Sequence, residues 1–230
     1  MIGAQVLTAG SMTLCWLLYV PVLCWAAWRA PWVELFTDSR RQHLLFGTIF
    51  ALFLLWLVRR DFETGVSYHF IGMTAVTLLL DWPLAIIGGL VAQLGLLMLG
   101  RQDLAALGVN GLLFIGLPVW VAEVCAILVE RAQPRSPFVY IFCSGFLAAA
   151  LSALLCLLLA LGVLSLEGIF GMPFWLSDYI GYLWLLIFPE AFINGMVISA
   201  LVVFSPEWLE TFNRTRYLSA PWNDKSNGGT

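Results

Sequence analysis

One histidine lies at the start of a long apolar stretch, and it is the side chain best suited to chemistry. His69 opens the segment 68–110, which is almost wholly apolar apart from Asp81-Trp82-Pro83 and its last eleven residues, GRQDLAALGVN. A charged side chain costs roughly 2.5–3.5 kcal/mol at the centre of a membrane-spanning helix, so ionisable residues there indicate function. His69 is therefore a candidate ligand for a divalent transition metal, or a proton relay. The structural alternative is an interfacial histidine hydrogen-bonded to a backbone carbonyl.

A carboxylate and an amide share one face of the last apolar segment. Glu190 and Asn194 are four residues apart, so a helix places them on the same side. Pro189, just before them, removes one backbone amide donor. The pair either lines a polar cavity or forms a hydrogen bond that packs one helix against another, and the sequence leaves both interpretations open.

The chain carries no pattern typical of an enzyme. It lacks the HExxH, GxSxG and Walker A motifs. Its five cysteines all lie in apolar segments and form no CxxC pair, and their odd number argues against a disulfide framework. We therefore expect no catalytic residues, no cofactor-binding residues and no permanently bound cofactor.

The composition indicates a polytopic membrane protein. Of 230 residues, 61% are hydrophobic and only 11% are charged, with a mean hydropathy of +0.92. Soluble domains carry about 25% charged residues. The pI of about 5.3 and the lack of a basic stripe argue against nucleic-acid binding. The apolar segments that could cross a bilayer are 5–28, 44–58, 68–80, 84–99, 111–129, 138–163 and 180–204.

We therefore predict an all-α polytopic bundle of seven transmembrane helices in contact with membrane lipid, or six if one short segment fails to cross. A single transmembrane domain would cover residues 1–212, followed by a polar tail over 213–230. Seven crossings put eight basic residues on one side and three on the other, which places the C-terminus in the cytoplasm and the N-terminus outside a bacterial plasma membrane. The larger group is Arg29, Arg40, Arg41, Arg131, Arg135, Arg214, Arg216 and Lys225, and the smaller is Arg59, Arg60 and Arg101.

The central segment resembles the CbiM/NikM family, the substrate-capturing membrane components of energy-coupling-factor transporters for cobalt and nickel. His69-Phe70-Ile71-Gly72 stands where that family has Gly-His-Leu-Leu-Gly, and Asp81-Trp82-Pro83 stands for its Gly-Pro-Trp-like turn. The stretch GRQDLAALGVN matches the family's loop G-x-x-x-L-x-A-L-G-x-N, which here ends at Asn110. The last span, PEAFINGMVISALVV followed by SPEWL, is similar to the family's acidic closing helix.

The resemblance implies that the N-terminus enters a chamber from outside. In the family, the metal is held by the N-terminal amine, a histidine at the second position and the histidine of the Gly-His segment. These positions correspond here to Met1, Ile2 and His69, and Ile2 cannot ligate a metal. The resemblance thus gives Met1 and His69 as metal ligands. Asn110 would organise the chamber, with Glu190 and Asn194 as further polar residues.

We therefore expect a permease that captures a divalent transition metal such as cobalt or nickel as its transported substrate. Because the chain has no nucleotide-binding motif, it would work with ATP-binding subunits and a transmembrane coupling subunit. The alternative, favoured by Ile2, is a non-transporting scaffold or assembly protein of the same fold. Such a protein would assist the delivery of a metal or cofactor to a membrane complex.

Overall fold

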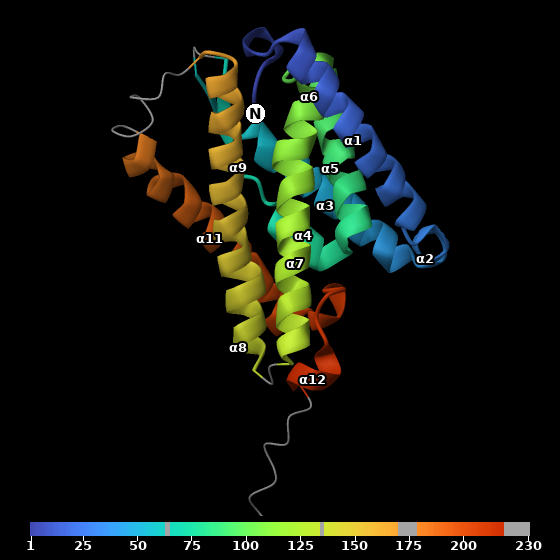
Figure 1. Cartoon of the computed structure of the whole chain (residues 1–230). Helices are drawn as coiled ribbons and strands as arrows, with labels where there is room; N and C mark the ends of the chain where they lie inside the picture. Colours follow the sequence, from blue (N-terminus) through green and yellow to red (C-terminus); the bar gives the residue numbers. More distant parts are fainter. Residues whose placement is uncertain (63–64, 134–135, 170–178, 219–230) are drawn as a thin grey trace, which may run out of the picture.

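The computed structural model describes residues 1–62, 65–133, 136–169 and 179–218, and these form a helical bundle with one small sheet (Figure 1). The helices of the bundle are α1 (Ala9–Arg29), α3 (Ser39–Leu57), α4 (Met73–Leu80), α5 (Trp82–Met98), α6 (Leu104–Gly111), α7 (Leu117–Ala132), α8 (Pro137–Tyr140), α9 (Ala148–Leu166) and α11 (Tyr179–Phe204). Shorter helices are η1 (Ala4–Val6), α2 (Trp32–Thr37), η4 (Pro206–Trp208) and α12 (Arg214–Leu218). The strands are β1 (Arg59–Asp61) and β2 (Ser67–His69).

Several helices are long enough to cross a membrane. The π-helical segments η2 (Leu112–Gly116) and η3 (Ile141–Leu147) join α6 to α7 and α8 to α9 without a break. Among the described residues, four helical segments combine membrane-spanning length with high hydropathy, and α5 is a shorter apolar helix of 17 residues. The four are Ala9–Arg29, Leu104–Ala132, Pro137–Leu166 and Leu185–Phe204.

The predicted loop before residue 111 is helical over its second half. Helix α6 starts at Leu104, directly after Asp103 at the N-cap position, and continues through η2 into α7. Leu-Ala-Ala-Leu is a run of strong helix formers, and aspartate favours the position before a helix. As a result, Asn110 lies in the buried second half of α6 and is fully buried itself.

The predicted helix from Tyr68 is also wrong at its start. β2 ends at His69, and α4 begins only at Met73, so the residues from Tyr68 to Gly72 are not helical as we expected. β1 and β2 pair antiparallel, with Arg59 opposite His69 and Asp61 opposite Ser67. The N-terminal residues add to the free edge of β2, where the Ser67 amide donates to the Met1 carbonyl at 2.7 Å.

Helix α4 is too short to cross a membrane alone. Its eight residues cover about 12 Å at 1.5 Å per residue, less than half of a hydrocarbon core of about 30 Å. Gly72 supplies its N-cap with φ of +70°, a left-handed conformation that strains residues with a Cβ. At the other end, Asp81 caps α5 by accepting from the Trp82 amide at 2.8 Å.

Small residues let the helices pack closely, which is typical of membrane bundles. Helix α6 meets α1 where a Cβ at Gly111 would lie 2.3 Å from the Tyr19 ring. Helix α11 meets the η3 segment in the same way, because a Cβ at Gly195 would lie 2.2 Å from the Phe146 ring.

Basic residues of the predicted cytoplasmic side form ion pairs and hydrogen bonds with glutamates. Arg41 pairs with Glu210 at 2.9 Å, and Arg216 donates to Glu130 at 2.7 Å. The predicted boundary at residue 212 stays a prediction. Beyond it, Tyr217 of α12 is buried and stacks on the Phe212 ring. Residues 219–230 of the predicted tail lie outside the described part of the chain.

Candidate functional site

His69 is buried, and one of its ring nitrogens has no hydrogen-bond partner in the part of the chain that the structure describes. Its Nδ1 lies 2.8 Å from the Phe70 carbonyl oxygen, and its ring contacts Trp56 and Phe114 edge to face. Nε2 has no hydrogen-bond partner among the described residues. An imidazole that donates from Nδ1 to a backbone carbonyl carries its lone pair on Nε2, which is the arrangement of a metal-ligating histidine.

The N-terminal amine is hydrogen-bonded to the strand that carries this histidine. Met1 is buried, and its amine donates to the Ser67 carbonyl, two residues before His69 on the same strand. Burial, and next the positive charge of Arg59, lowers the pKa of the Met1 amine to about 4. The amine is therefore neutral at pH 7 and has a lone pair to offer.

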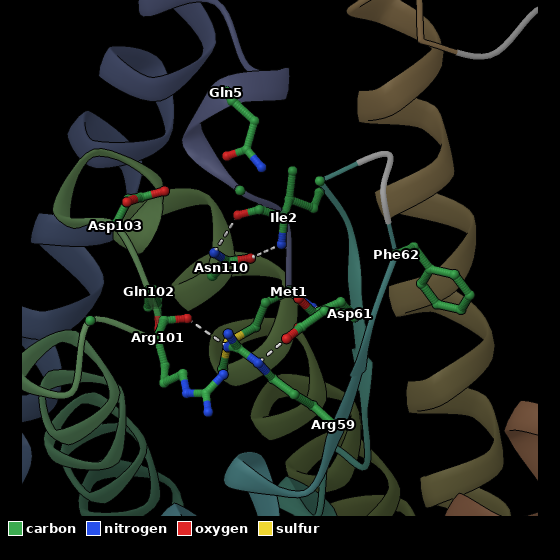
Figure 2. Close-up of a pocket in the computed structure, with 14 residues that line it drawn as sticks. Met1, Ile2, Gln5, Arg59, Asp61, Phe62, Arg101, Gln102, Asp103 and Asn110 are labelled. Carbon is green, nitrogen blue, oxygen red and sulfur yellow. Dashed lines mark hydrogen bonds and ion pairs between the residues drawn. The ribbon is translucent and has the colours of Figure 1, made fainter.

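Asn110 holds the N-terminal segment in place. Its side-chain oxygen accepts from the Ile2 amide at 2.7 Å, and its side-chain nitrogen donates to the Ile2 carbonyl at 2.9 Å (Figure 2). The amide of Gly3 also donates to the Gly65 carbonyl at 2.9 Å. The N-terminal segment is thus hydrogen-bonded to Asn110 on one side and to Gly65 on the other, and these bonds fix the position of the Met1 amine.

A polar cavity opens over the N-terminus, with a volume of about 230 Å³. Arg59 reaches into its wall between Asp61 and the backbone of Arg101 (Figure 2). Its Nε lies 2.9 Å from an Asp61 carboxylate oxygen, and its Nη1 donates to the Arg101 carbonyl at 2.6 Å. Gln102 also lines the cavity, and neither atom of its buried amide has a hydrogen-bond partner among the described residues.

Glu190 and Asn194 are not among the residues that line this cavity; they cap helix α4 from α11. The Glu190 carboxylate accepts from the Ile71 and Gly72 amides at 2.8 and 2.7 Å. The Asn194 amide donates to Glu190 at 2.8 Å, and its oxygen accepts from the Ala75 amide at 2.9 Å. Glu190 and Asn194 therefore form hydrogen bonds that pack α11 against α4, which is the second of our two interpretations. Each side chain bonds to backbone amides at the start of α4, and the two side chains also bond to each other.

Sequence reasoning missed the role of Arg59 and Gln102 in the cavity. Arg59 entered the prediction only as a charge that sets topology, because its pairing with His69 depends on the register of two strands. Within the described ranges, no group of three or more histidine, cysteine, aspartate or glutamate side chains could hold a metal ion. The candidate nitrogen donors are thus the Met1 amine and His69 Nε2.

The comparisons with known proteins identify the family. A family model for the cobalt uptake substrate-specific transmembrane region, CbiM, matches residues 2–208. The chain belongs to the CbiM family. It is accordingly a multi-pass integral membrane protein and a substrate-specific transmembrane component of transition metal uptake, and it is not an enzyme. This confirms our predictions of family, function class and membrane location, and the all-α fold class.

Two crystal structures share this CbiM-family fold. One, of a truncated transition metal transporter, has a TM-score of 0.65 and 18% identity, covering 88% of this chain and 98% of that one. The other, of a transition metal transporter, has a TM-score of 0.64 and 18% identity, covering 88% and 92%. At this identity they support the fold alone. The comparison with curated proteins gives no match.

Proposed function

We propose that this chain captures a divalent transition metal, cobalt or nickel, between the Met1 amine and His69 Nε2. The observation that carries the proposal is the buried His69 Nε2 that has no partner among the described residues, on the same strand to which the neutral Met1 amine is hydrogen-bonded. Neutral imidazole and amine nitrogens suit these ions, whereas an unpaired buried nitrogen with no ligand would cost free energy. Asn110 sets the register of the N-terminal segment and thereby the position of the amine.

We further propose seven membrane crossings, with the N-terminus outside and the C-terminus in the cytoplasm. The third crossing would combine the extended residues before Gly72 with the half-helix α4, because α4 alone is too short. Non-helical backbone at membrane depth is tolerated where protein covers it, and Glu190 supplies the partners that this backbone needs. The basic residues joined to Glu130 and Glu210 would then face the cytoplasm.

Membership of the CbiM family implies a place in an energy-coupling-factor transporter complex. The chain has no nucleotide-binding motif. We propose that ATP-binding subunits and a transmembrane coupling subunit supply the energy for uptake, while this chain provides the binding site.

The test is metal binding by the purified protein with its native N-terminus, measured by mass spectrometry of bound metal and by calorimetry with Co²⁺ and Ni²⁺. We expect stoichiometric metal in the parent protein and a loss of at least about tenfold in affinity in His69→Ala. His43→Ala is the matched control, since His43 is exposed on α3. Equal affinity in His69→Ala and the parent would refute the ligand role.

The second candidate function is a membrane scaffold that assists metal or cofactor delivery without transporting it. The observation that favours it is Ile2, which is buried at the second position and offers no donor side chain. Cells that express the protein with its transporter partners would accumulate radioactive cobalt if it is a permease. Metal bound by the purified protein without any such accumulation would favour the scaffold.

A further inference from the structure

We propose that Trp56 and Phe114 are positioning residues of the metal site, because together they fix the plane of the His69 ring and the direction of its Nε2 lone pair. This role rests on the proposed capture function, in which His69 is a metal ligand. An indole and a phenyl ring offer no lone pair that a metal would take, so both side chains act through the histidine.

The His69 ring contacts two aromatic rings that come from different helices. The centroid of the imidazole lies 5.7 Å from that of Trp56 on α3 and 5.5 Å from that of Phe114 in η2, with interplanar angles of 61° and 65°. Aromatic pairs favour this edge-to-face arrangement at centroid separations of about 4.5–7 Å. Rotation of the imidazole would disturb both contacts and also the 2.8 Å contact between Nδ1 and the Phe70 carbonyl. The ring is therefore restrained at three places.

Trp56 also holds the backbone that follows His69. Its side chain is fully buried, and its Nε1 donates to the Ile71 carbonyl at 3.0 Å. Because α4 begins at Met73 with Gly72 as its N-cap, Ile71 precedes the helix and depends on side chains for its hydrogen-bond partners. Trp56 thus restrains the metal ligand twice, through its ring and through the chain that carries it.

A π-helical segment sets the direction of Phe114. In η2 (Leu112–Gly116), the Leu117 amide donates to the Leu112 carbonyl, five residues back instead of four. Pro118 gives the reason, because its ring would clash with the Phe114 carbonyl in a regular α-helix and it has no amide hydrogen to donate. The wider turn changes the face of the helix on which the following side chains lie.

Helix α9 stabilises this turn. The Leu113 carbonyl would be the next acceptor in the π-helical pattern, but Pro118 cannot donate to it. It accepts instead from Cys156 Sγ at 2.9 Å, so a buried carbonyl keeps a partner. π-helical turns are rare and often occur at functional sites. Phe114 follows Asn110, which holds the N-terminal segment, by four residues, so one continuous helix bears on both candidate nitrogen donors.

An imidazole that is held in place before the metal arrives binds it more tightly than one that must first be ordered. Replacing the groups that orient a ligating histidine typically lowers metal affinity by about 10–100-fold. We therefore expect the affinity for Co²⁺ to depend on Trp56 and Phe114, although neither touches the ion.

The experiment measures Co²⁺ binding by the purified full-length protein with its native N-terminus, by calorimetry and by the visible absorption bands of the bound ion. Trp56→Phe keeps a ring but loses the bond to the Ile71 carbonyl, and Phe114→Leu removes the second ring. We expect each to lower Co²⁺ affinity at least about tenfold. We also expect each to shift the bands at saturation, because Nε2 changes its direction. A loss of stability alone would not move those bands.

The matched controls come from a separate hydrophobic cluster, which does not contain Trp56 or Phe114. Tyr140→Phe also keeps a buried ring and loses one hydrogen bond, between the Tyr140 hydroxyl and Thr211 Oγ1 at 2.7 Å. Phe212→Leu also removes a buried ring that contacts an aromatic neighbour. We expect both controls to lower stability while Co²⁺ affinity and the absorption bands stay as in the parent.

If Phe114→Leu fails to fold, Pro118→Ala serves in its place. Alanine restores the amide donor and removes the clash, so the helix can become α-helical and Phe114 should turn away from His69. We expect Co²⁺ affinity to fall at least about tenfold while thermal stability is equal or higher, because alanine favours a helix far more than proline does.

The outcomes separate this inference from the capture function. Co²⁺ binding that is lost in His69→Ala but has parental affinity and bands in Trp56→Phe and Phe114→Leu would overturn the positioning role and leave the capture function intact. Equal weakening by Tyr140→Phe and Phe212→Leu would overturn it as well, since affinity would then follow stability. Failure of the parent protein to bind Co²⁺ would refute the capture function and, with it, this inference.

Discussion

Replacing Glu190 tests whether the half-helix α4 depends on its cap from α11. In Glu190→Ala, the buried amides of Ile71 and Gly72 lose their acceptor. Each unsatisfied buried donor costs roughly 1–3 kcal/mol, so we expect a loss of about 2–6 kcal/mol in the free energy of unfolding. Glu190→Gln keeps the shape and one carbonyl oxygen but turns an amide group toward one of the donors, so we expect roughly 1–3 kcal/mol.

Glu123→Gln is the matched control for this prediction. Glu123 lies on α7, and its Oε2 has no hydrogen-bond partner among the described residues, so its replacement should change stability by less than about 0.5 kcal/mol. Unfolding is followed by circular dichroism in detergent micelles during titration with a denaturing detergent. The result that would refute our reasoning is Glu190→Ala as stable as the parent, or Glu123→Gln as damaging as Glu190→Gln.

Measuring the Co²⁺ affinity of the same variants should show whether the Glu190 cap also positions His69. Ile71 and Gly72 follow His69 directly in sequence, so an uncapped α4 would let the His69 segment move. We therefore expect Glu190→Gln to weaken Co²⁺ affinity at least tenfold, while Glu123→Gln leaves it unchanged. Unchanged affinity in a destabilised Glu190→Gln would show that the cap supports the fold but does not position His69.

Three further predictions concern the N-terminal segment and its neighbours. Asn110→Ala leaves the buried amide and carbonyl of Ile2 without partners and should destabilise the protein by about 2–6 kcal/mol, measured by the same unfolding titration. Adding one alanine before Met1 displaces the buried amine and should lower Co²⁺ affinity at least tenfold in calorimetry. Hydrogen bonds from Ser11 and Thr8 lower the pKa of Glu167 below 4.5, so its stabilising effect is present above that pH and is lost as the pH falls through the lowered value. The melting temperatures of Glu167→Gln and the parent should therefore differ at pH 7 and converge as the pH falls through the lowered pKa; a constant difference would contradict this.

The sequence by itself determined the long apolar helices and their ends. The predicted spans 138–163 and 180–204 correspond to Pro137–Leu166 and to α11, Tyr179–Phe204. Asp81, which caps α5, directly precedes that helix in the sequence. These features depend on the length of apolar runs and on local capping, and both are carried by neighbouring residues. The family resemblance was likewise carried by short local motifs.

Only the tertiary structure decided how the site is assembled. An apolar run does not show whether its residues form a strand or a helix, so the extended backbone at His69 was missed. Its position on β2 depends on pairing with Arg59 on β1 and with the N-terminal segment on its other edge. The cap of α4 joins Glu190 to Gly72, which are 118 residues apart. Such pairs form because buried backbone groups must find partners wherever the fold places them, and no local pattern records which partners those are.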